Sequence, residues 1–178
     1  MLEIFLKILP FFAIIGLGYL AVRTRFFSEE ATIYLTRFVF YFALSAMLFG
    51  FAANLDVASI FSLPFVFAYL LGTSAVWLVV AGVAVRRGAN REEAVFEAHA
   101  GIIGNVGFLG IPMLSLLLGP QAVGPVLLVL AVDLIVFSSI LTMAITGLRA
   151  GKVSARTFGI LAVGLAKNPM IGSVVLGI

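Results

Sequence analysis

Residues 101–113 read GIIGNVGFLGIPM, where a glycine recurs at every third position and a proline follows two positions after the last glycine. In a helix interior each glycine costs about 1 kcal/mol relative to alanine, and a proline costs about 3 kcal/mol. The flanking residues are apolar enough for lipid, where every backbone group that leaves a helix needs another partner. We therefore predict a discontinuous transmembrane helix, with a first half from about Ala94 to Gly104, an unwound segment from Asn105 to Ile111, and a second half starting at Pro112.

The start of this second half is the predicted substrate site. A helix N-terminus carries partial positive charge and free N–H groups, which suit a carboxylate, and an asparagine amide stands beside it. An alternative is that the glycines only allow close helix packing and that the proline only kinks the helix. Packing does not require an amide at mid-depth, so we favour the substrate site. The residues expected to bind the substrate are Asn105, Gly107, Phe108, Gly110 and Pro112.

The composition around this stretch belongs to a membrane protein. Of 178 residues, 63% are hydrophobic and only 11% are charged, whereas soluble domains carry roughly a quarter charged residues. The chain has no cysteine and a single histidine, which argues against a metal site. It lacks the Gly-x-Ser-x-Gly and His-Glu-x-x-His motifs of hydrolases. We expect neither an enzyme nor a nucleic-acid partner, because the basic residues are dispersed among short loops.

Uncharged runs of about 20 residues, long enough to cross a bilayer, divide the chain into five spans. Residues 1–148 are expected to form an all-α unit of five transmembrane helices, in which the turn GPQAVGP at 119–125 separates the last two. Residues 149–167 would form a basic cytoplasmic linker with an interfacial helix, and residues 168–178 the start of an incomplete sixth helix. The five predicted spans cover about 4–22, 38–53, the residues between Asp56 and Arg86, 94–118 and 123–148.

Basic residues occur in alternate loops, which predicts the orientation. The loops rich in Lys and Arg are expected to be cytoplasmic, so the N-terminus would lie outside a plasma (inner) membrane that the chain crosses several times. An odd number of spans would let a second copy enter the membrane inverted, as in many secondary transporters. We therefore expect a second repeat or a homodimer. The basic loop residues are Arg23, Arg25, Arg86, Arg87, Arg91, Arg149, Lys152 and Arg156.

One acidic residue lies deep within the fifth span. Asp133 stands about ten residues inside it, where a carboxylate is costly and usually functional, so we predict that it couples transport to H⁺ or Na⁺. An alternative is that Asp133 only fastens helices together. His99 and Glu97 are interpreted as a solvated pair at the cytoplasmic face. No cofactor is expected besides the coupling ion.

Three motifs resemble the auxin efflux carrier family, whose bacterial members include malonate-type organic anion permeases. They are residues 105–112 (NVGFLGIP), 167–171 (KNPMI) and 16–19 (GLGY). The resemblance covers the chain as a first repeat. It implies ten spans in two inverted five-span repeats, with the fourth and ninth spans broken at prolines and crossing at the substrate site. Asn105 and Pro112 would then form the first-repeat half of that crossover, although Val106 replaces a threonine common in the family.

Together these features predict secondary active transport of a small organic anion, a carboxylate or dicarboxylate, by alternating access, with the substrate bound at the broken fourth helix. The alternative is a non-transporting membrane half-module, surrounded by membrane lipid, that assembles with a second repeat or another chain.

Overall fold

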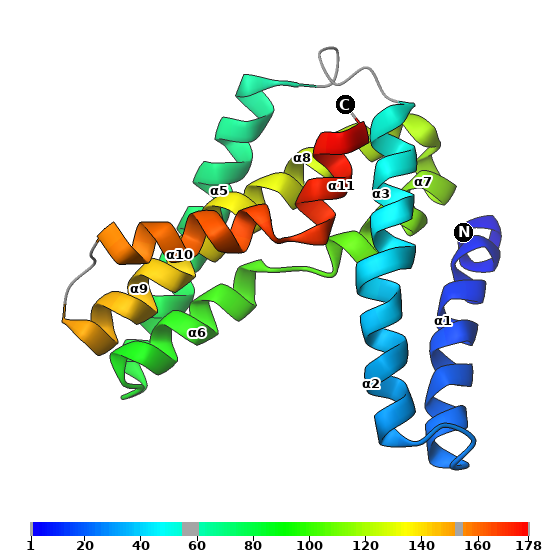
Figure 1. Cartoon of the computed structure of the whole chain (residues 1–178), viewed down its shortest axis with the longest axis horizontal. Coiled ribbons are helices and arrows are strands. Elements are labelled where there is room, and N and C mark those ends of the chain that lie inside the picture. The colour runs from blue at the N-terminus through cyan, green and yellow to red at the C-terminus, as the bar shows by residue number, and fades with distance from the viewer. Residues whose placement is uncertain (1, 55–60, 152–154, 178) are drawn as a thin grey trace.

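The computed structural model describes residues 2–54, 61–151 and 155–177, and every regular element within these ranges is a helix (Figure 1). Asp56 and Lys152, which were assigned to loops, lie outside the described residues. The α-helices are interrupted or extended by three π-helical turns (η1, η2, η4) and one 3-10 turn (η3). The elements are α1 (Leu2–Arg23), α2 (Glu29–Phe38), η1 (Val39–Ala43), α3 (Leu44–Ala53), α5 (Leu63–Arg86), α6 (Arg91–Ile102), η2 (Val106–Gly110), α7 (Ile111–Leu118), η3 (Pro120–Ala122), α8 (Val123–Val132), η4 (Asp133–Phe137), α9 (Ser138–Ala150), α10 (Ala155–Ala166) and α11 (Pro169–Gly177).

Among the described residues, five helical stretches are long and apolar enough to cross a membrane, which confirms the predicted five-span architecture. The second stretch begins earlier than the sequence suggested, because the Ser28 hydroxyl caps α2 by accepting the N–H of Ala31 at 3.1 Å. Arg37 therefore lies inside a helix and not before it. The stretches are Leu2–Arg23, Glu29–Ala53, Leu63–Arg86, Arg91–Leu118 and Pro120–Arg149.

The predicted helix start at Asn168-Pro169 is present. The Asn168 side chain accepts the N–H of Met170 at 2.9 Å, which caps α11, and α10 precedes it at an angle of 59°. Together α10 and α11 are long and apolar enough for one span broken at this cap. The part of the chain that the structure describes therefore contains two interrupted apolar stretches, one at α6–η2 and one at α10–α11.

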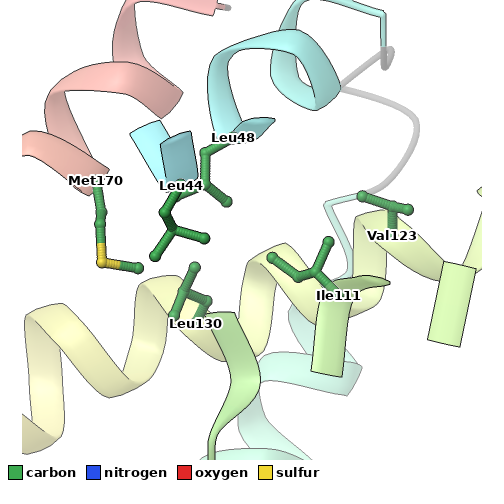
Figure 2. Packing of buried hydrophobic residues seen from close by; sticks show 6 residues of the cluster. All are labelled: Leu44, Leu48, Ile111, Val123, Leu130 and Met170. Carbon is green, nitrogen blue, oxygen red and sulfur yellow. The ribbon is translucent and has the colours of Figure 1, made fainter. Parts of the chain in front are cut away.

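A small core forms where α3, α7, α8 and α11 meet (Figure 2). Figure 2 shows Met170 of α11 and Leu44 of α3 pointing toward Leu130 of α8. Most other apolar side chains are exposed, and α1 has no buried residue at all. In a membrane protein such surfaces face lipid or another transmembrane unit. The buried residues of the core are Leu44, Leu48, Ile111, Val123, Leu130 and Met170.

The connections that carry basic residues lie on one side of the molecule. In Figure 1 the α1–α2 connection, the α5–α6 connection and the end of α9 all lie toward the lower edge. Arg149 at the end of α9 forms an ion pair with Glu92 at the start of α6. Which side of the membrane these connections face stays a prediction from the basic loops.

Candidate functional site

The fourth span is broken, as predicted. Helix α6 ends at Ile102, and Ile103 adopts an extended conformation with φ −85° and ψ 116°. The chain becomes helical again at Val106, where Asn105 serves as the N-cap residue. The Asn105 side chain accepts the N–H of Phe108 at 3.2 Å, and its backbone carbonyl accepts the N–H of Gly110 at 2.9 Å.

The predicted position of the break was wrong. The non-helical segment covers residues 103–105, not Asn105 to Ile111, and the second half begins at Val106, not at Pro112. The N-cap bond of Asn105 accounts for the early start, because it satisfies a first-turn donor that glycine-rich sequence alone would leave free. Pro112 follows the π-turn inside the helix, at a position where its missing N–H removes one helical hydrogen bond.

The new helix presents free donors at its N-terminus. Within the described residues, the N–H groups of Val106 and Gly107 have no hydrogen-bond partner. Both belong to the first helical turn, where the partial positive charge of the helix dipole is concentrated. Asn105 is exposed beside them, with its side-chain amide nitrogen available as a further donor. This arrangement of donors is suited to an anion.

A pocket of about 170 Å³ opens at the break. It brings together four of the six residues selected from the sequence, namely Asn105, Gly107, Phe108 and Asp133. The other two, Gly110 and Pro112, lie further along the helix and do not line the pocket. At roughly 30 Å³ per water molecule, the volume suits a small organic acid and not a large one. The lining is formed by residues 103–108 together with His99, Leu130, Asp133, Leu134, Ser138 and Met170.

Asp133 is buried in the pocket wall. It is 5% exposed, and its Oδ1 accepts a hydrogen bond from the Tyr69 hydroxyl of α5 at 2.7 Å. The π-turn η4 starts at Asp133, and the Ser138 hydroxyl donates to the Asp133 carbonyl at 3.0 Å. Such π-turns are often found at functional sites. Tyr69 was not recognised from the sequence, because nothing in the third span distinguishes it from a packing aromatic residue.

His99 also lines the pocket, which the sequence analysis missed. Glu97 forms an ion pair with Arg87 at the end of α5, whereas His99 lies close enough to Asp133 to interact with it electrostatically. The predicted His99–Glu97 pair is therefore wrong. Helix geometry would have predicted that His99 and Glu97 point in different directions, because residues two apart do not share a helix face.

Comparison with known proteins identifies relatives of the chain. Residues 3–177 match a family described as "Membrane transport protein". A protein of Rhizobium meliloti (strain 1021) with the name "Putative malonate transporter" is 30% identical over 184 residues, which cover 100% of this chain and 56% of that protein. The chain therefore spans about half the length of this curated relative. No solved structure matches the chain.

Proposed function

This chain belongs to the membrane transport protein family, and from that membership we propose that it transports a small organic anion, a carboxylate or dicarboxylate. The family consists of transport proteins and not of enzymes, and the apolar helices make this chain a multi-pass membrane protein. The name of the Rhizobium meliloti relative makes malonate the first compound to test.

The observation that supports this proposal best is the pair of free N–H groups at Val106 and Gly107. They lie within an apolar span, where an unpaired backbone donor is costly and where a bound carboxylate would satisfy it. Asn105 holds the turn in place through its bond to Phe108 and offers its amide to the same ligand. Half-helix N-termini bind anionic substrate groups in other secondary transporters.

Asp133 is the proposed coupling residue. It lies in the wall of the same pocket, so the charge on its carboxylate acts directly on an anion bound at the break. Coupling to either H⁺ or Na⁺ is compatible with a single carboxylate at this depth. Alternating access would follow from movement of one group of helices against another around the two interrupted stretches, α6–η2 and α10–α11.

A second transmembrane unit is part of this proposal. Asn105 and Phe108 are exposed, with Phe108 at 45%, so one wall of the site remains open to a further helix. A second repeat or a second copy of the chain would provide that wall, with basic loops in the cytoplasm and the N-terminus outside. The alternative is a membrane half-module that transports nothing until it assembles with this second unit. Reconstituting the chain alone and in the presence of that unit distinguishes the two.

The test is uptake of radiolabelled malonate by proteoliposomes that contain the full-length protein. Asn105→Leu removes both the cap and the amide and should abolish uptake. Asn105→Ser keeps a side-chain cap and should retain part of the uptake. Pro112→Ala restores a backbone donor next to the π-turn and should reduce uptake several-fold by changing the pairing of that turn. Uptake at the wild-type rate in Asn105→Leu would reject the site.

A further inference from the structure

Three helices bring a tyrosine, a histidine and an aspartate to one place. Tyr69 belongs to α5, His99 to α6 and Asp133 to the start of η4. The Tyr69 hydroxyl donates to Oδ1 of Asp133 at 2.7 Å, which fixes the carboxylate against α5. His99 and Asp133 line the pocket that also contains Asn105. The cluster therefore adjoins the proposed anion site directly.

The histidine has a buried nitrogen that has no hydrogen-bond partner among the described residues. Within the described residues, two buried side-chain nitrogens lack a hydrogen-bond partner, Nε1 of Trp77 and Nδ1 of His99. Buried polar atoms are rarely left unpaired, and those that are often serve a functional role. The indole nitrogen of Trp77 only donates, whereas an imidazole nitrogen can bind and release a proton near neutral pH. His99 is thus the one of the two that can change its charge.

No other charged side chain of the described residues lines this pocket. The remaining charged groups on the helices that surround it lie at the basic ends of α5, α6 and α9. There Glu92 pairs with Arg149, and Glu97 pairs with Arg87. The described residues of η2, α7, α8 and α11 contain no charged side chain. Asp133 is therefore the charged group that shares the pocket lining with His99. The remaining charged residues of α5, α6, α9 and the α10–α11 stretch are Arg86, Arg91 and Glu93 at the basic end, Arg156 in α10 and Lys167 before α11.

The cluster is better suited to a proton than to a metal cation. Hard cations require several oxygen ligands, and one oxygen of Asp133 already accepts the Tyr69 hydroxyl. The Ser138 hydroxyl donates to the backbone carbonyl of Asp133, and His99 offers nitrogen. Among the described residues no group of three or more His, Cys, Asp and Glu side chains is placed to hold a metal ion. A carboxylate and an imidazole, by contrast, each bind a proton.

We propose that His99 and Asp133 share one exchangeable proton, that binding of this proton is linked to binding of the anion at the break, and that Tyr69 positions Asp133. This inference rests on the proposed function and names its coupling ion. Without the proton the pair has a net charge of −1 and repels the carboxylate of an anion at the break. This repulsion is strong because the two lie close together in a medium of low dielectric constant. With the proton the pair is neutral. By linkage, the anion then binds more tightly to the protonated pair and promotes its protonation to the same extent.

The proton is the only species exchanged in this step. It comes from water on the side where the anion enters and binds to a carboxylate oxygen of Asp133 or to a ring nitrogen of His99. No other bond forms or breaks, and no oxidant or reductant is involved. When the anion leaves on the opposite side, the pair regains its negative charge and the proton returns to water there. The anion and the proton thus cross the membrane together.

The experiment measures malonate binding to the purified full-length protein by isothermal titration calorimetry between about pH 5.5 and 8.5, the range around histidine titration. Wild-type affinity should fall with rising pH, by up to about tenfold per pH unit where one proton is linked. His99→Gln leaves an unpaired carboxylate and should weaken binding at neutral pH by about tenfold or more. Asp133→Asn leaves only the imidazole to take up a proton, so at pH 8.5, where the wild-type pair is negative, it should bind malonate about tenfold or more tightly than the wild type. The control Glu92→Gln alters an exposed carboxylate at the basic end and should keep the wild-type pH dependence.

The double variant separates a charge effect from a packing effect. His99→Gln combined with Asp133→Asn is neutral at every pH, so it should bind malonate more tightly than His99→Gln alone and without pH dependence. If His99 and Asp133 had a purely structural role, the double variant would have the lowest malonate affinity of all the variants. Wild-type affinity at pH 8.5 in Asp133→Asn, or no recovery in the double variant, would overturn the shared proton. Absence of malonate binding to the wild type throughout this pH range would instead reject the proposed malonate function, and the inference with it.

Discussion

Gly107 and Met170 join the two interrupted helices of the chain. A Cβ atom on Gly107 would lie 3.2 Å from Cε of Met170 and 3.6 Å from the Leu44 side chain. Gly107 belongs to the first turn after the break in the fourth span, and Met170 belongs to the first turn of α11. Each helix restart thus packs against the other.

The first prediction uses this contact. Gly107→Ala should be tolerated, because the flexible end of the methionine can move by a few tenths of an ångström. Gly107→Val should push α11 away and reduce malonate uptake at least tenfold, because overpacking costs about 1–3 kcal/mol. Combining Gly107→Val with Met170→Ala should restore part of the uptake. Equal uptake in the Val variant and in the double variant would show that the contact does not limit transport.

The second prediction separates the two roles of Asn105. Asn105→Ala should lower the stability of the protein by about 1 kcal/mol, as expected for loss of an N-cap. Asn105→Asp keeps a good cap and should leave thermal stability unchanged, but it places a negative charge beside the free N–H groups of Val106 and Gly107. Malonate uptake should therefore be lost in a protein that remains folded. Thermal unfolding in detergent and uptake in proteoliposomes, measured on the same preparation, test both parts.

The spans and the existence of a break could be predicted from the sequence because both depend on residues that are neighbours along the chain. Long uncharged runs determine where helices can cross lipid, and glycines with a proline weaken one of them. The exact position of the break depended on a single side-chain bond, donated by the Phe108 N–H to Asn105, and the second half therefore begins at Val106, six residues before Pro112. The contact between Tyr69 and Asp133 joins residues 64 positions apart. No pattern within one helix reports such a pair, which is why Tyr69 emerged only from the structure.

The third prediction concerns the packing of α11 against α3. A Cβ atom on Gly177 would lie 2.7 Å from Cβ of Ala52 and 2.8 Å from the carbonyl oxygen of Phe49, so the two backbones meet at this glycine. Gly177→Ala should therefore destabilise the protein by about 1–3 kcal/mol. Gly172 is the matched control in the same helix, because a Cβ there would have no neighbour within 4 Å. Gly172→Ala should be neutral or slightly stabilising in thermal unfolding. Equal melting temperatures for the two variants would contradict the close approach.

The fourth prediction isolates the hydroxyl of Tyr69. Tyr69→Phe removes the hydrogen bond to Asp133 but keeps the ring, which packs edge-on against Phe137 at a centroid distance of 6.5 Å. Because Asp133 is 5% exposed, water does not readily replace the lost donor, and stability should fall by about 1–3 kcal/mol. The charged carboxylate also loses a donor that stabilises it, so the protonated pair is favoured, and the fall of malonate affinity with rising pH should begin at a higher pH than in the wild type. Tyr34, which is 60% exposed on α2, provides the control, and Tyr34→Phe should change neither quantity. If both variants behave alike in calorimetry and in thermal unfolding, the hydroxyl of Tyr69 does not position Asp133.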